Sequence, residues 1–265
     1  MTDVMQLSLA QAVLGVGSGS LVGLSLGLVG GGGSILAVPL LVYLVGVRDP
    51  HLAIGTSAVA VAASAAMNLI DHARAGHVVW RCALLFAGCG IGGAYLGSTL
   101  GKMVDGQKLL AAFGVLMLVV AALTVRRRSA AGAENVRLGR DNVLWLIALG
   151  LATGMLAGFF GIGGGFLIVP GLMLATGMPI LNAIGSSLVA VTAFGVTTAA
   201  NYAVSGSVAW MLAALFLAGG IVGGRIGSRS AKTLAARSGM LHCIFAAVVC
   251  LVAIYVLVRS LNLIQ

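Results

Sequence analysis

The chain has 265 residues, of which 60% are hydrophobic and 8% charged, and its formal net charge is +9. Soluble domains average about 45–50% apolar and about 25% charged residues, so this composition excludes a soluble enzyme, a nucleic-acid-binding domain and a disordered chain. Glycine contributes 40 residues, roughly twice its usual share of about 7%, and glycine in apolar helices is typical of close helix packing in a bilayer. We therefore predict an all-α polytopic membrane protein.

Ten apolar blocks predict the membrane passes. In chain order they lie at 9–28, 34–47, 53–71, 79–99 and 107–125, and then at 143–160, 164–178, 182–203, 208–228 and 238–258. The blocks 34–47 and 164–178 follow glycine runs and are shorter than the roughly 20 residues of a full span. We predict that each is either a short span or a re-entrant segment. The polar stretch 126–142 predicts a cytoplasmic linker between a first repeat at 1–125 and a second repeat at 143–265.

Four short motifs recur in the same order in both halves, at a nearly constant spacing. GLVG at 27–30, AIGTS at 53–57, GHVVW at 76–80 and GS at 97–98 correspond to GFFG at 158–161, AIGSS at 183–187, GSVAW at 206–210 and GS at 227–228. Pro39 and Pro170 follow the first motif of each half. We therefore predict that the chain is an internal duplication.

The basic residues favour an odd number of passes in each half. If each glycine run is a turn, each half has five passes, and nine basic residues share one side of the membrane against four on the other. If each run is only a kink, the division is seven against six. The positive-inside rule prefers the first arrangement. Five passes invert the second half relative to the first and leave both termini outside, and inverted repeats with broken helices are typical of secondary transporters.

The two glycine runs are candidate binding sites for an anion. A helix that begins within the membrane presents unpaired N–H groups and a partial positive charge, and glycine lets a ligand approach the backbone. Close packing of small residues is the alternative. The candidate substrate-binding residues here are Gly32, Gly33 and Ser34 in the first half and Gly163, Gly164 and Gly165 in the second.

The hydroxyl groups of the AIG(T/S)S motifs are further candidates, because a hydroxyl donates a hydrogen bond to an anion without adding a charge. They are Thr56, Ser57, Ser186 and Ser187. The alternative is a structural role, in which such hydroxyls bond to their own helix or join neighbouring helices. Residue spacing does not separate these two interpretations.

Polar residues near the ends of the third passes are candidates for a proton relay or gate, because ionisable groups in a span are functional candidates by default. They are Asn68, Asp71 and His72, and in the second half Asn201 and Tyr202. The alternative is that Asp71 forms a surface ion pair with Arg74. The four cysteines lack metal-ligand spacing, and no carboxylate follows Asp141. We therefore expect no metal, no cofactor and no catalytic set.

Together, the glycine runs with their following prolines, the AIG(T/S)S motifs and the Gly-x-Val-x-Trp motifs resemble the TauE/SafE sulfite exporter family over about residues 10–260. The resemblance implies a multi-pass carrier of the bacterial inner membrane for small sulfur-containing or carboxylated anions, such as sulfite or a sulfonate. We expect alternating access at the repeat interface and export, since the membrane potential already drives anions outward.

The alternatives to an anion exporter are an anion channel, a proton-coupled uptake carrier and a membrane enzyme. The expected partners are a small anion and the lipid bilayer, without nucleic acid. The sequence leaves the oligomeric state open.

Overall fold

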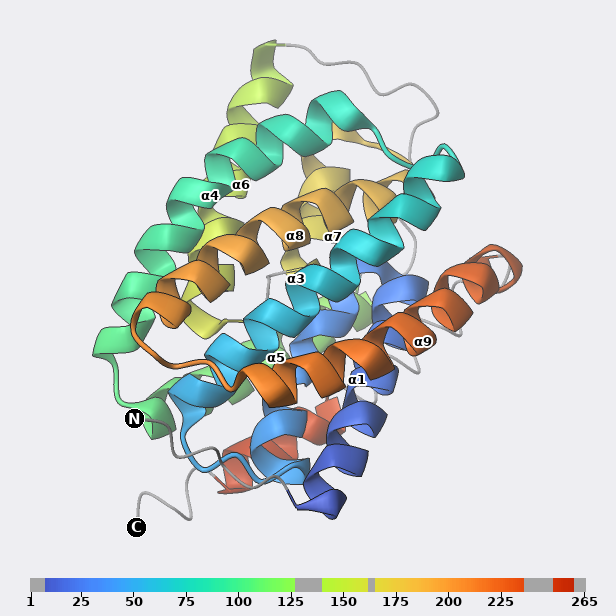
Figure 1. Ribbon diagram of the computed structural model, residues 1–265. Coiled ribbons are helices and arrows are strands. Elements are labelled where there is room, and N and C mark those ends of the chain that lie inside the picture. The colour runs from blue at the N-terminus through green and yellow to red at the C-terminus, as the bar shows by residue number, and fades with distance from the viewer. Residues whose placement is uncertain (1–7, 127–139, 162–164, 236–249, 260–265) are drawn as a thin grey trace.

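The computed structural model describes residues 8–126, 140–161, 165–235 and 250–259, and within these ranges it is built of helices (Figure 1). The long helices are α1 (Leu9–Val29), α3 (Pro50–Arg74), α4 (Trp80–Met103), α5 (Gly106–Arg126), α6 (Arg140–Phe160), α8 (Ile180–Val204) and α9 (Trp210–Ala235). Shorter pieces are the 3-10 segment η1 (Gly30–Leu36), α2 (Ala37–Pro39), the π segment η2 (Leu40–Leu44), α7 (Gly165–Thr176) and the helix Cys250–Arg259. The prediction of an all-helical chain is confirmed for this part of the molecule.

Six of the described helices are long and apolar enough to cross a membrane, namely α1, α3, α4, α6, α8 and α9. By contrast, α7 has 12 residues, which at 1.5 Å per residue is about 18 Å, well short of the roughly 30 Å hydrocarbon core. The apolar helical stretch Gly33–Leu44 is equally short. The two blocks that follow the glycine runs are therefore shorter than full spans, as their lengths predicted.

The chain folds back on itself where the first glycine run occurs. A side chain at Gly33 would collide with the backbone of Ser25 and Leu26 in α1, so η1 returns along the helix that precedes it. In the second half, α6 ends at Phe160, and the φ of +68° at the following Gly161 is a left-handed conformation that glycine adopts readily. The segments η1 and α7 contact each other across the two halves, so both short pieces lie in the interior.

Glycine stripes pack α1 against α9 and α4 against α6, the two most extensive helix contacts of the molecule. In each of these stripes, a Cβ atom would collide with the backbone of the partner helix. Glycines spaced four residues apart let helices approach this closely in a membrane, where Cα–H···O contacts contribute further. The glycines are Gly19, Gly23 and Gly27 on α1, Gly219, Gly223 and Gly227 on α9, Gly93, Gly97 and Gly101 on α4, and Gly150, Gly154 and Gly158 on α6.

The contacts also give the relative direction of the helices. Gly19 faces Phe216 and Gly23 faces Gly220, so α1 and α9 run parallel. The same order of contacts makes α3 parallel to α9 and α4 parallel to α6. Between the central helices the order is reversed, because Gly55 of α3 lies by Tyr202, near the end of α8. Figure 1 shows α4 with α6 on one side, α1 with α9 on the other, and α3 and α8 between them.

Two tight turns connect the central helices to α4 and α9. Gly76 and Gly206 have φ angles of +75° and +72°, which favour glycine. In each turn the backbone N–H of the residue after the glycine donates back to the preceding helix. His77 donates to the carbonyl of His72, and Ser207 donates to the carbonyl of Tyr202, both at 3.0 Å. These bonds close the carboxyl ends of α3 and α8, so the two turns have the same geometry in both halves.

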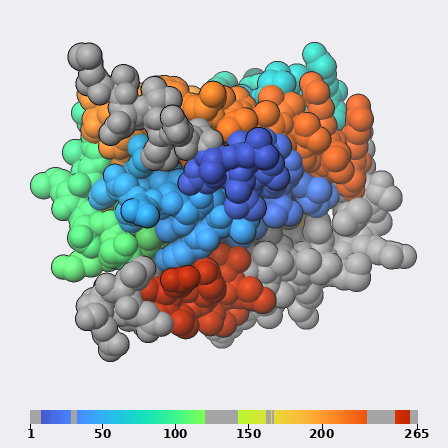
Figure 2. Space-filling model, turned by 60° about the horizontal axis from the view of Figure 1, so that its bottom comes forward, coloured from blue at the N-terminus to red at the C-terminus, as the bar shows by residue number. Residues whose placement is uncertain are grey.

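The helix Cys250–Arg259 packs against the first half of the chain. The rings of Tyr255 and Tyr43 meet edge to face with centroids 5.4 Å apart, and Leu257 lies beside Gly114 of α5. Figure 2 shows this segment, in red, against the blue surface of the first half. Most of the predicted tenth pass, at 238–258, lies outside the described residues.

Candidate functional site

Reciprocal hydrogen bonds join the two halves. The backbone N–H of Ala209 donates to Thr56 Oγ1 at 3.0 Å, and the backbone N–H of Val79 donates to Ser186 Oγ at 2.9 Å. Thr56 and Ser186 hold the same place in their AIG(T/S)S motifs, and Val79 and Ala209 hold the same place in the Gly-x-Val-x-Trp motifs. Each hydroxyl pairs an N–H next to a helix start, which the helix itself leaves unpaired. We call this pair of contacts the reciprocal joint.

Glycines beside these hydroxyls make the joint possible. A side chain at Gly55 would collide with the carbonyl oxygen of Ser207, and one at Gly185 would meet the carbonyl oxygen of His77 at 2.5 Å. Both central helices therefore approach the opposite turn with no room for a Cβ atom. The two repeated motifs thus dock on each other across the halves, which favours the structural interpretation for Thr56 and Ser186.

The second hydroxyl of each motif turns toward its own helix. Ser57 Oγ donates to the carbonyl oxygen of Ile54 at 2.9 Å and lies 3.4 Å from the carbonyl oxygen of Gly161. Ser187 Oγ donates to the carbonyl oxygen of Ile184 at 2.7 Å. Both serines are fully buried. Ser57 therefore lies directly beside the break that follows α6, and its contact with an anion stays a prediction.

The glycine-run candidates lie at the short central segments. Gly32 and Ser34 belong to η1, where Ser34 is fully buried, and Gly165 begins α7. At Gly33 the backbone of α1 fills the space beside the Cα atom, as close packing requires. Gly163 and Gly164 lie outside the described residues. The proposed anion cradle stays a prediction at all of these positions.

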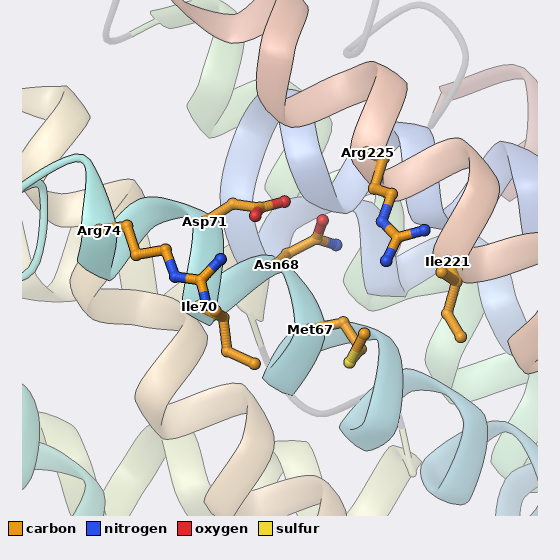
Figure 3. Close-up of a pocket in the computed structure, with 7 residues that line it drawn as sticks. All are labelled: Met67, Asn68, Ile70, Asp71, Arg74, Ile221 and Arg225. Atoms are coloured by element: carbon orange, nitrogen blue, oxygen red, sulfur yellow. The ribbon is translucent and has the colours of Figure 1, made fainter.

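A cavity of about 210 Å³ lies between α3 and α9 (Figure 3). Its lining contains Met67, Asn68, Ile70, Asp71, Arg74, Ile221 and Arg225. Asn68 is buried, whereas Asp71, Arg74 and Arg225 are exposed. The hydroxyl of Ser228 on α9 donates to Asp71 Oδ2 at 3.3 Å. Two of the predicted relay residues therefore share one cavity, together with two arginines.

The other predicted relay residues belong to a separate cluster between α8 and α4. Asn201 Nδ2 donates to Ser98 Oγ at 2.7 Å and to Thr99 Oγ1 at 3.0 Å. Lys102 Nζ donates to the side-chain and backbone oxygens of Asn201, at 2.7 and 3.1 Å, and to Ser205 Oγ at 2.8 Å. All three ammonium protons of Lys102 are thus paired. These contacts fasten α4 to the carboxyl end of α8.

Aromatic rings surround the two remaining candidates. Tyr202 is fully buried, its ring stacks on that of His51 with centroids 6.3 Å apart, and Lys102 Nζ lies 5.9 Å from its centroid. His72 is buried with its ring 5.6 Å from that of His77. Because α3 and α8 are antiparallel, His72 and Tyr202 lie at opposite ends of the pair. The structure therefore does not bring the five relay candidates together.

Sequence reasoning missed the lysine cluster and the glycine stripes. In the sequence Lys102 contributes only to the charge balance between the two sides, although it follows the serine of the recurring Gly-Ser motif by four residues, one helical turn. The glycine stripes were detectable, because glycines four residues apart recur on all four helices. The pairing of these helices, α1 with α9 and α4 with α6, was not detectable, because the glycine spacing within one helix does not show which helix packs against it.

Six apolar candidate spans and two short central segments define a multi-pass membrane protein, in which repeated motifs form the joint. The profile of the family described as "Sulfite exporter TauE/SafE" matches residues 15–256, and the chain belongs to this family. It is therefore a membrane transporter and not an enzyme.

Known relatives come from bacteria and an archaeon. The chain is 51% identical over 255 residues to a "Probable membrane transporter protein" of Xylella fastidiosa (strain 9a5c), covering 96% of this chain and 98% of the relative. It is 26% identical to the similarly named YunE of Bacillus subtilis (strain 168), over 76% of this chain and 81% of the relative. It is 27% identical to MJ0441 of Methanocaldococcus jannaschii, over 64% of both chains. No solved structure matches the chain.

Proposed function

We propose that the chain is a secondary transporter that exports small sulfur-containing or carboxylated anions across the bacterial inner membrane. The family description supports a sulfite-type substrate. Transport proceeds by alternating access at the interface between two inverted halves of five passes each.

The directions of the helices are the observation that carries this proposal. Helices α1, α3 and α9 run one way and α4, α6 and α8 run the other, so helices in corresponding places of the two halves have opposite directions. This supports the inverted arrangement. In transporters with inverted repeats and broken helices, the substrate site lies at the repeat interface. The segments η1 and α7 meet there, beside the buried hydroxyl of Ser57.

A difference between the two ends supports alternating access. At the α3–α9 end there is a cavity of about 210 Å³. At the corresponding α8–α4 end, Lys102 and Asn201 are tied by hydrogen bonds. An inverted pair of halves interconverts its two states by exchanging these roles, with one end tied and the other accessible.

The membrane potential provides the driving force for export. It is worth about 2.3 kcal/mol per charge per 100 mV and moves anions outward, so export needs no coupled ion. Concentrative uptake would need a proton relay, for which Asp71 and His72 are the local candidates. Neither residue is repeated in the second half, where Asn201 and Tyr202 hold the corresponding places.

Flux into proteoliposomes tests the function. Sulfite, sulfoacetate and lactate are supplied outside vesicles that contain unlabelled anion, and uptake is followed under zero potential and under an imposed potential. A carrier gives saturable flux that rises when the same anion is present on the far side. Saturable flux without this trans-stimulation indicates a channel and contradicts alternating access. Flux of none of the three anions contradicts the substrate class.

Cysteine accessibility tests the topology. Single cysteines at Ser129 and Ser230 are expected to resist membrane-impermeant thiol reagents in intact cells, because the positive-inside rule places both on the cytoplasmic side. A cysteine at Ser205, exposed at the opposite end of α8, is the matched control and is expected to react. Reaction at 129 or 230 contradicts the arrangement of two five-pass halves.

A further inference from the structure

The α3–α9 cavity contains a buried hydrogen-bond donor that lacks a partner. Asn68 is 2% exposed, and its Nδ2 atom finds no hydrogen-bond partner among the described residues. Gly224 of α9 packs so closely against this amide that an added Cβ atom would lie 2.6 Å from Oδ1 and 2.8 Å from Nδ2. Buried polar groups in native proteins are nearly always paired with protein, water or ligand. Asn68 therefore points to an acceptor that occupies the cavity.

Two arginines stand at the rim of the same cavity. Figure 3 shows the guanidinium group of Arg225 pointing from α9 toward Asn68, while Arg74 extends from the end of α3 on the other side of Asp71. Within the described part of the chain, neither guanidinium group forms a hydrogen bond or an ion pair. Together with Asp71, the ionised side chains sum to one positive charge. Arginine binds carboxylate, sulfonate and phosphate oxygens through paired N–H groups, so the rim suits a singly charged oxyanion.

The second half provides an internal comparison. In the corresponding places it has Thr198 for Asn68 and Tyr95 for Arg225, so the arginine and the amide are both absent there. Its counterpart of Asp71 is Asn201, whose side chain is already paired with Ser98. The arginine-lined cavity is therefore a feature of one end of the molecule, whereas the cation at the other end, Lys102, is already paired. By the positive-inside rule this is the cytoplasmic end.

We propose that Asn68, Arg74 and Arg225 form an oxyanion-binding site at the cytoplasmic mouth between α3 and α9. Asn68 Nδ2 donates to one oxygen at the floor, and Arg225 holds two others at the rim. A cavity of about 210 Å³ has room for one small anion with part of its hydration shell. The Asp71 carboxylate opposes the anion and keeps its binding weak enough for release. The identification of this ligand with the transported anion rests on the transport function proposed above. The phosphate of a lipid headgroup has the same chemistry and is a second source of such an oxyanion.

A cysteine in the cavity wall reports on the site without any transport. Met67 lines the cavity and is 38% exposed. Met67→Cys is made in a background in which Cys82, Cys89, Cys243 and Cys250 are replaced by alanine, and the protein is placed in nanodiscs. Its reaction with a sulfonate-bearing methanethiosulfonate is compared with its reaction with a trimethylammonium-bearing one. Each rate is divided by the rate of the same reagent with a free thiol in solution. On this scale we expect the anionic reagent to react roughly tenfold faster than the cationic one, and we expect sulfate to slow the anionic reaction.

Matched variants identify the groups responsible. Arg225→Gln is expected to lower the preference for the anionic reagent about tenfold, the size of one charge-assisted hydrogen bond (about 1.4 kcal/mol). Arg225→Tyr, the residue at the corresponding place in the second half, is expected to do the same and guards against a folding defect of the first variant. Arg81→Gln removes an equal charge from an exposed residue at the start of α4, outside the cavity lining, and is expected to leave the preference unchanged.

Lipid composition separates the two sources of the oxyanion. If sulfate slows labelling in both phosphatidylcholine and phosphatidylglycerol nanodiscs, the site takes a free anion. If the anionic preference is lost in phosphatidylglycerol and restored in phosphatidylcholine, a headgroup occupies the site. Either result supports the proposed oxyanion site. Equal preferences for the anionic reagent in Arg225→Gln, in Arg81→Gln and in the parent protein overturn it. A parent that binds sulfate but transports no anion contradicts the proposed function and leaves the site standing.

Discussion

Removal of the Thr56 hydroxyl tests the reciprocal joint directly. Thr56→Val keeps the shape of the side chain but removes the acceptor of the Ala209 N–H, 3.0 Å away. Thr56 is fully buried, so no water replaces its oxygen. Leaving such an N–H unpaired costs about 1–3 kcal/mol, while hydrogen bonds between membrane helices average about 0.6 and reach about 1.7 kcal/mol. We expect a loss of about 1.5 kcal/mol in the free energy of unfolding.

The second hydrogen bond of the reciprocal joint and a matched control variant test the same expectation. Ser186→Ala removes the acceptor of the Val79 N–H and is expected to cost a similar amount. Thr197→Val is the control, because the Thr197 hydroxyl donates at 2.8 Å to the Ala193 carbonyl four residues earlier in its own helix. That carbonyl keeps its helical bond, so the change is expected to cost less than about 0.5 kcal/mol.

The assay is reversible unfolding of the purified protein in mixed micelles of increasing dodecyl sulfate content. The double variant Thr56→Val with Ser186→Ala is expected to lose the sum of the two single effects, because the bonds join different helix pairs. If Thr56→Val unfolds at the same detergent fraction as Thr197→Val, the hydroxyl does not hold α9 and the reasoning fails.

Three further outcomes are expected. Gly90→Leu collides with the backbone of Gly150 and the ring of Phe194 and is expected to prevent folding, whereas Gly88→Leu meets open space and is expected to be tolerated; yield after size-exclusion chromatography measures both. Lys102→Met removes three hydrogen bonds between α4 and α8 and is expected to lower both the melting temperature and the anion flux. An unchanged melting temperature and flux would show that the cluster does not fasten the two helices. Flux driven by a pH gradient at zero potential is expected to concentrate no substrate, and concentration that is lost in Asp71→Asn would establish proton coupling.

The membrane spans were predictable because they depend on local sequence. A helix in lipid must pair its backbone internally, so apolar length marks α3 and α8 well. The four recurring motifs, which predict a duplication, are visible in the sequence without any tertiary information. The short segments were equally visible, because 12 residues do not cross the hydrocarbon core.

The partners of the polar residues were not predictable, because they depend on which helices meet. Thr56 has the same local sequence whether its hydroxyl faces an anion or the Ala209 N–H. Asn201 and Asp71 correspond in the repeat, yet within the described residues Lys102 and Ser98 pair with the side chain of Asn201, and Ser228 donates to Asp71. Such differences arise from α4 and α9, which are remote in sequence from the residues they contact.

The reciprocal joint also bears on how the protein is made. During synthesis α3 and α4 enter the membrane before α8 and α9 exist, so Thr56 and the N–H of Val79 lack their partners until the second half has been inserted. The first half is therefore a membrane-inserted but unfinished intermediate, and its helix α4 acquires the bond at its start only when Ser186 arrives. A chain cut at the linker is therefore expected to form these two bonds only when both pieces are in the same membrane.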